Sequence, residues 1–211
     1  MLEEIEIVKP EEIEKRSMEI IDSILGETAW TGLELSIVKR CIHTSADFDY
    51  AKNLYFSENS AKIAVDALKR GASIITDTKM AASGINKKKL AQLGGSVYCF
   101  MDDSDVAREA KARGVTRSSV CMERGMALPG EKIFAVGNAP TALIRLYELI
   151  GSSKVSPAAV IGVPVGFVNV EESKQLIMKT AVPCIVAQGR KGGSNIAAAI
   201  CNALIYAGSG R

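Results

Sequence analysis

The chain has 211 residues and a net charge of +2, with 47% hydrophobic and 24% charged residues, which is typical of a soluble globular α/β domain. Its lysines and arginines are scattered and aromatic residues make up only 5%, which excludes a basic, base-stacking face for nucleic acid. The acidic start lacks the basic and apolar regions of a secretory signal, and no apolar run approaches the roughly 18 residues of a membrane span.

The first 56 residues are predicted to be a helical segment. Pro10 suits a helix start and Gly26 a helix stop, with an apolar stripe at Ile13, Ile20, Ile21 and Ile24 between them. A second helical pattern covers residues 31–43. The only histidine, His43, is expected at or just past the C-terminus of that helix.

From residue 57 onward, short apolar strands alternate with helical patterns. The predicted strands are residues 72–77, 96–101, 132–137, 158–164 and 183–189. The predicted helices are residues 58–71, 103–114, 139–151, 171–180 and 195–208. This order indicates a five-stranded, mainly parallel sheet with helices on both faces. We therefore predict one domain over residues 1–211, made of a helical segment (1–56) and an α/β core (57–211).

Small or polar clusters follow all five predicted strands. They read DTKM, DDS, GNAPT, PVGF and GRKGGS. Since ligands of open α/β sheets bind outside the carboxyl ends of the strands, we expect these clusters to surround one site. Each cluster taken alone is also explained as an ordinary turn.

The glycine-rich stretch from Gly189 to Asn195 joins the last strand to the last helix. Its free N–H groups favour an anion, although a plain flexible turn is the alternative. It matches neither the P-loop nor the dinucleotide-binding spacing, so a carboxylate suits it as well as a phosphate.

Two further stretches offer polar contacts. In GNAPTAL, a helix cap explains Asn138 and Pro140 but not the polar Thr141. In TRSS, Arg117 beside two hydroxyls is able to hold a carboxylate, and a solvated helix cap is the alternative. Asp102 and Asp103 are interpreted as helix caps, and no metal ligand set is predicted.

A lone histidine is more often structural than catalytic on composition alone. As a catalyst, His43 would lend one proton near neutral pH and take it back. That suits an isomerisation without net proton change, whereas a hydrolytic triad or a metal centre needs more partners. The five cysteines are odd in number and form no C-x-x-C pair, which favours a reduced, cytoplasmic setting over zinc or disulfides.

These motifs, in chain order, resemble the precorrin-8X / cobalt-precorrin-8 methylmutase family of cobalamin biosynthesis. The resemblance rests on RSMEII, the IH at residues 42–43, IITDTKMAASGI, TRSS, AVGNAPTAL, IGVPVGFVNVEESK and GRKGGS, and it covers nearly the whole chain. GNAPTAL together with PVGFV and ESK is highly specific.

The resemblance implies a flavodoxin-like three-layer α/β/α fold, a homodimer and no cofactor. The implied reaction moves a methyl group from C-11 to C-12 of a tetrapyrrole that carries many carboxylates. It implies that His43 is catalytic and that Ser17 and Arg117 contact the substrate. Met80, Val165 and Phe167 are expected to line the apolar part of the site. The full set of expected substrate-binding residues is Arg16, Ser17, Asp77, Met80, Arg117, Ser118, Asn138, Thr141, Gly166, Gly189, Arg190, Gly192 and Gly193.

Two other classes of protein compete with this interpretation. A non-catalytic carrier of a tetrapyrrole or another anionic ligand would tolerate His43→Ala without loss of function. A nucleotide-dependent transferase would need a phosphate-binding fingerprint after the first strand, and TDTKMAAS is not one. Whether the substrate contains cobalt is left open by the sequence.

Overall fold

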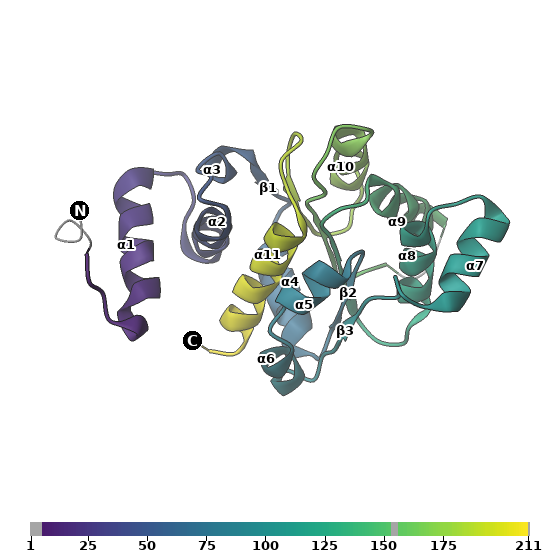
Figure 1. Cartoon of the computed structure of the whole chain (residues 1–211), viewed down its shortest axis with the longest axis horizontal. Helices are drawn as coiled ribbons and strands as arrows, with labels where there is room; N and C mark the ends of the chain where they lie inside the picture. Colours follow the sequence, from purple (N-terminus) through teal and green to yellow (C-terminus); the bar gives the residue numbers. More distant parts are fainter. Residues whose placement is uncertain (1–5, 153–155, 211) are drawn as a thin grey trace.

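The computed structural model describes residues 6–152 and 156–210, and its centre is one twisted sheet (Figure 1). In the described residues the sheet has six strands: β1 (Leu54–Phe56), β2 (Ser73–Thr76), β3 (Val97–Tyr98), β4 (Lys132–Val136), β5 (Ala159–Gly162) and β6 (Cys184–Ala187). Their order is β1-β6-β5-β4-β2-β3, and only β1 runs antiparallel to its neighbour. Numbered in chain order, the five parallel strands read 2-1-3-4-5, which is the flavodoxin-like order.

Successive strand residues enter two separate apolar cores, because side chains alternate between the faces of a sheet. Ile74 and Ile133 belong to the core under one face, whereas Ile75 and Phe134 belong to the core under the other. Strands β4, β5 and β6 are buried along their whole length, which explains their uninterrupted apolar sequences.

Helices cover both faces of the sheet. One face is covered by α4 (Ser60–Lys69), α5 (Lys79–Gly84), α6 (Lys87–Gln92) and α11 (Ser194–Gly208). The other is covered by α8 (Arg117–Ala127), α9 (Pro140–Ser152) and α10 (Val170–Met178). Helix α7 (Ser104–Arg113) packs outside this layer, against α8.

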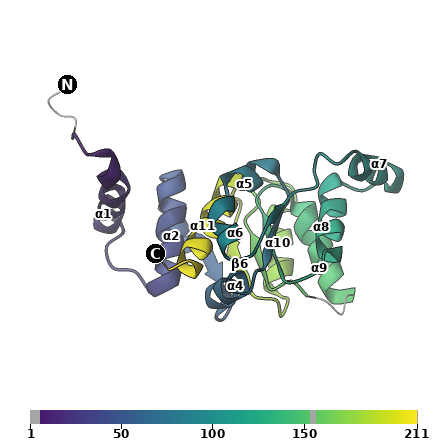
Figure 2. The same cartoon turned by 90° about the horizontal axis from the view of Figure 1, so that it is seen from below.

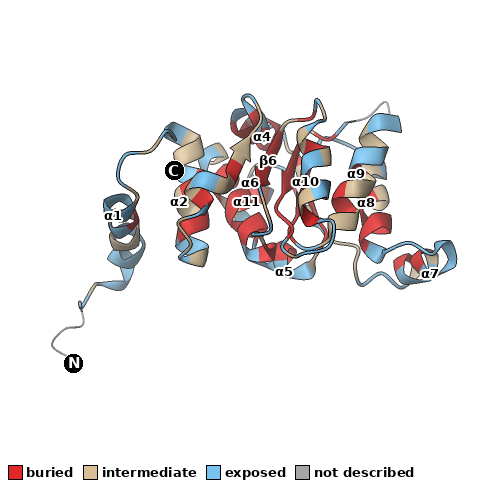
Figure 3. Cartoon of the chain, turned by 90° about the horizontal axis from the view of Figure 1, so that it is seen from above, coloured by how far each residue is buried: buried red, intermediate tan, exposed pale blue. Residues whose placement is uncertain are grey.

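The N-terminal helices extend the molecule away from the sheet. A short 3₁₀ turn (Pro10–Glu12) leads into α1 (Ile13–Leu25), which packs against α2 (Gly32–Ser45), and α2 packs against α11. Figures 2 and 3 show α1 at one end of the molecule, with most of its surface exposed. Ile21 is buried, but Ile20 and Ile24 are 41% and 62% exposed.

The three-layer α/β fold and the five predicted strands are confirmed, and the structure adds a sixth strand, β1. This three-residue strand lies within the segment predicted to be helical, after the four-residue helix α3 (Tyr50–Asn53). It is too short to show an alternating pattern, and its pairing with β6 defines it. His43 lies in the last turn of α2, as expected.

Candidate active site

The carboxyl ends of the parallel strands meet at one edge of the sheet, and the end of α2 leads to the same edge. Because β1 is antiparallel to β6, its first residue, Leu54, pairs with the last residue of β6, Ala187. The chain from His43 through α3 therefore arrives beside the loop that follows β6. The loop after β6 and α3 both lie at the top of the view in Figure 1.

Asp77 ties together the loops after β2 and β4, where the order of the flavodoxin-like sheet reverses. The buried carboxylate accepts hydrogen bonds from the N–H groups of Gly137 (2.8 Å), Asn138 (2.8 Å) and Ala139 (2.7 Å). Burial raises the pKa of the Asp77 carboxyl, although these donors oppose the rise. Both oxygens are thus engaged by the loop, and Asp77 orders the start of α9.

The loops after β5 and β6 are also joined by hydrogen bonds. Gly193 N–H donates to the carbonyl of Val163 (2.8 Å), and Gly166 N–H donates to the carbonyl of Arg190 (3.2 Å). At Gly192 a Cβ atom would lie 2.1 Å from the carbonyl oxygen of Val163, so only glycine permits this approach. Three of the four glycines expected in the site, Gly166, Gly192 and Gly193, therefore bring the two loops together.

Two acidic residues link the loop after β6 to the end of α2. Lys191 Nζ lies 2.6 Å from a carboxylate oxygen of Asp47 and 2.6 Å from one of Asp49. These ion pairs lower the pKa of Asp47, with the hydrogen bond from Lys191 as the main cause. The predicted anion-binding loop is thereby held against Asp47 and Asp49, which follow His43 closely in the chain.

His43 and Ser17 face one shallow apolar hollow of about 240 Å³ between α1 and α2. The remaining lining residues are apolar: Ile20, Ile21, Ile24, Ile42, Ala46 and Phe48. The Ser17 hydroxyl donates to the Ile13 carbonyl (2.9 Å), and no described residue hydrogen-bonds to the exposed His43 ring. The imidazole is therefore available to a ligand whose flat apolar face covers this hollow.

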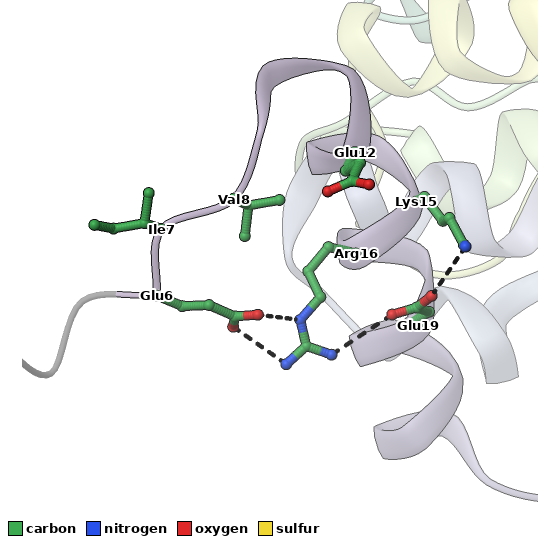
Figure 4. Close-up of a pocket in the computed structure, with 7 residues that line it drawn as sticks. All are labelled: Glu6, Ile7, Val8, Glu12, Lys15, Arg16 and Glu19. Carbon is green, nitrogen blue, oxygen red and sulfur yellow. Dashed lines mark hydrogen bonds and ion pairs between the residues drawn. The ribbon is translucent and has the colours of Figure 1, made fainter.

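Arg16 lies outside the His43 hollow. Its guanidinium donates to both carboxylate oxygens of Glu6 (2.7 and 3.2 Å) and lies 3.7 Å from Glu19, as Figure 4 shows. A substrate carboxylate at Arg16 would have to displace or share these acidic partners.

Arg117, Ser118 and Thr141 lie at the starts of α8 and α9, on the face of the sheet opposite α2. Arg117 is exposed and forms no ion pair with any described residue. The Thr141 hydroxyl is 2.9 Å from that of Thr116, which caps α8. The Ser118 hydroxyl is buried and faces the Met101 sulfur at 4.0 Å. Arg117 is thus the member of this group with a free charge.

The apolar side chains expected around the ligand are exposed. Phe167 and Met80 are 83% and 71% exposed, and Val165 is also exposed. Arg190 forms an ion pair with Glu171 (3.0 Å) and lies over the Phe167 ring at 5.8 Å. Exposed apolar groups beside cationic side chains suit a ligand with an apolar ring and acidic substituents.

Other kinds of site find less support. Residues 6–152 and 156–210 contain no group of three histidine, cysteine or acidic side chains placed to hold a metal ion. Four of the five free cysteines are buried, and burial raises the pKa of Cys41, Cys121 and Cys201 to about 12, which leaves them protonated. None of the described helices is long and apolar enough to cross a membrane.

Sequence reasoning missed two features of this edge, the acidic pair that binds Lys191 and the buried Lys174. The acidic pair Asp47 and Asp49 lies in a stretch without a recognised motif, and its partner Lys191 is 142 residues or more away. Lys174 is a buried lysine under the loop after β6. The sequence offered one signal of its burial: Lys174 falls on the same face of α10 as Val170 and Ile177, which are buried.

The fold defines a flavodoxin-like α/β protein whose candidate site residues lie in the loops after the parallel strands and in the hollow beside His43. The sequence model described as precorrin-8X methylmutase matches residues 12–207. The chain belongs to that family.

Three relatives illustrate the similarity. The cobalt-precorrin-8 methylmutase of Salmonella typhimurium is 45% identical over 206 residues, covering 95% of this chain and 96% of the relative. That of Priestia megaterium is 40% identical over 204 residues, covering 96% and 91%. The crystal structure of the precorrin-8X methylmutase from Thermus thermophilus has a TM-score of 0.85 and 37% identity, covering 93% of this chain and 97% of that one.

Proposed function

We propose that this protein is an isomerase of cobalamin biosynthesis that moves a methyl group from C-11 to C-12 of cobalt-precorrin-8, giving cobyrinate. The observation that carries the proposal is the 45% identity to a cobalt-precorrin-8 methylmutase over 95% of the chain. The names of the two relatives from Salmonella and Priestia favour the cobalt-containing substrate over its metal-free counterpart.

In the proposed mechanism, His43 acts as the single acid–base group. The macrocycle covers the apolar hollow between α1 and α2, where His43 and Ser17 face it. His43 protonates or hydrogen-bonds the ring beside the migrating centre and then recovers its proton. The bond from the methyl carbon to C-11 breaks as its bond to C-12 forms, so the reaction consumes neither a proton nor a reductant.

The acidic side chains of the substrate are proposed to meet cationic and N–H groups around the edge. Arg117 offers an unpaired guanidinium, and the loop after β6 offers Arg190 and the N–H groups between Gly189 and Gly193. Asn138 and Thr141 add polar contacts, and Met80, Val165, Gly166 and Phe167 line the apolar side. Asp77 contributes by holding the loop of Asn138 in place. Arg16 and Ser118 join the site only if their present contacts change.

A second copy of this chain is proposed to cover the exposed face of α1. The hollow at His43 is open, and its rim includes Ile20 and Ile24, which no described residue covers fully. A homodimer that buries these side chains would also enclose the substrate. The free, mostly buried thiols suit a reducing compartment, and we propose the cytoplasm.

The proposal is tested by mixing purified protein with cobalt-precorrin-8 and, separately, with metal-free precorrin-8. Methyl migration lets conjugation extend through C-11, so turnover should change the visible spectrum while the mass stays the same. We expect a faster change with the cobalt substrate. Tight binding of both compounds without a spectral change would instead indicate a carrier, and neither binding nor change would exclude a tetrapyrrole role.

A further inference from the structure

Lys174 of α10 is a fully buried lysine without an acidic partner among the described residues. Its side chain is 1% exposed, and Nζ donates to the carbonyls of Gly189 (2.7 Å) and Lys191 (2.9 Å). Burial lowers the pKa of Lys174 to about 8, with a weak opposing effect from Glu171. Burying an ammonium is unfavourable, so its placement under this loop requires an explanation.

The two hydrogen bonds fix the direction of the loop's peptide groups. In a trans peptide, the N–H points away from the carbonyl of the preceding residue. With the carbonyls of Gly189 and Lys191 turned inward to Lys174, the N–H groups of Arg190 and Gly192 must point outward. Gly189 adopts a positive φ of 73°, which allows the chain to turn in this way.

The carbonyl between these two also has a hydrogen-bond partner in the protein. Arg190 O accepts the N–H of Gly166, so three successive carbonyls accept hydrogen bonds from the protein. By contrast, the N–H groups of Arg190, Lys191 and Gly192 donate to no acceptor in residues 6–152 and 156–210. The cationic side chains of the same loop are already paired, Arg190 with Glu171 and Lys191 with Asp47 and Asp49. The run of N–H groups without a protein acceptor is therefore the feature of this loop that suits a carboxylate.

We propose that Lys174 is the positioning residue of this carboxylate site. It holds the loop after β6 with its carbonyls inward, so that the N–H groups of residues 190–192 face the acidic side chains of the substrate. Lys174 itself touches no substrate. This inference rests on the proposed function for the identity of the ligand, but its structural part does not depend on turnover.

Two matched lysine variants separate this role from a general effect on stability. Lys132, at the amino end of β4, is also buried and donates to two carbonyls, those of Met126 and Leu128. Lys179, at the end of α10, is exposed. We therefore compare Lys174→Met with Lys132→Met and Lys179→Met, measuring KM and kcat for cobalt-precorrin-8.

For Lys174→Met, KM should rise about tenfold or more while kcat stays within about threefold, because loss of one or two charge-assisted contacts weakens binding on that scale. In the two control variants KM should stay within about twofold. An unchanged KM in Lys174→Met would overturn the proposal. If that variant does not fold, Lys174→Gln replaces it. Its shorter, neutral amide keeps a donor, so KM should rise by less than in Lys174→Met but by more than the twofold limit of the controls, and an unchanged KM would overturn the proposal.

Backbone ¹⁵N relaxation gives a second measurement that needs no substrate. The order parameters of residues 189–193 should fall from roughly 0.85 toward 0.6 in Lys174→Met and remain unchanged in Lys132→Met. Unchanged values in Lys174→Met would refute the positioning role even if the enzyme is active. Absence of turnover in the unmodified protein would refute the proposed function, while a fall in these order parameters would still support the role of Lys174 in the loop.

Discussion

Asp77 shows how one buried side chain fixes the geometry of two loops. Its position directly after β2 suggests a group that faces the ligand, but its carboxylate is turned inward to three N–H groups at the start of α9. Three donors need an acceptor with two oxygens, which an aspartate provides and an asparagine does not.

Asp77→Asn should therefore destabilise the protein by about 1–3 kcal/mol, because at least one buried N–H loses its acceptor. Urea denaturation measures this effect. The control is Asp66→Asn, which removes an exposed ion pair with Lys62 on α4 and should change the free energy of unfolding by less than about 1 kcal/mol. Equal midpoints for Asp77→Asn and the unmodified protein would show that the three hydrogen bonds contribute nothing.

The positions of several candidate residues within the helices and loops were predictable, but their contacts were not. A lone histidine at a helix end and glycines after strands are visible in the sequence, and the structure places His43 in the last turn of α2 and these glycines in the loops after β5 and β6. The inward turn of Asp77 and the ion pairs of Lys191 with Asp47 and Asp49 depend on residues far apart in the chain. No local pattern encodes such contacts.

Among the elements, α1 differs most from the rest. The other long helices bury an apolar face against the sheet or against a neighbour, whereas α1 buries only Ile21 fully and leaves other isoleucines of its stripe exposed. The periodicity of residues 13–25 predicted the helix correctly but not what it packs against. An apolar stripe that stays exposed in a single chain is typical of a surface that binds another protein.

Ile24→Glu should dissociate the proposed homodimer, because a charge would replace an exposed apolar side chain of the stripe that the second copy is proposed to cover. Sedimentation velocity at micromolar concentration should show a dimer for the unmodified protein and a monomer for the variant. Val115→Glu is the control: Val115 is similarly apolar and partly exposed but lies between α7 and α8, far from α1, and its substitution should leave the dimer intact. A monomer in the unmodified protein would refute the dimer.

For the whole molecule, the buried thiols determine part of the response to alkaline pH. The pKa of Cys201 is raised from 9.0 to about 12 by burial in α11. Between these values the unfolded chain releases a proton that the folded protein retains, so stability falls as pH rises through this window and is fully present below pH 9.

Cys201→Ala removes one such group, which allows its contribution to be measured. Stability should decline less steeply with pH in the variant, by about 1.4 kcal/mol per pH unit above pH 9. Urea unfolding of both proteins under reducing conditions at pH 8, 9 and 10 gives the two slopes. Parallel declines would mean that the pKa of the Cys201 thiol is the same in the folded and unfolded states, which would contradict this prediction.

The overall architecture was the most predictable level. Alternating strands and helices gave the parallel sheet and its two helical layers, because buried parallel strands are continuous apolar runs. The antiparallel edge strand β1 was missed, since three residues carry too little pattern and its partner β6 lies about 130 residues away.

The central claim is that His43 lends a proton for methyl migration, and its most direct test is turnover by His43→Ala. We predict that kcat for cobalt-precorrin-8 falls about 10²- to 10⁴-fold while the Kd for cobyrinate stays within about threefold, with Thr44→Ala as the control. Turnover by His43→Ala at the rate of the unmodified protein would contradict the account and assign the proton transfer to another group.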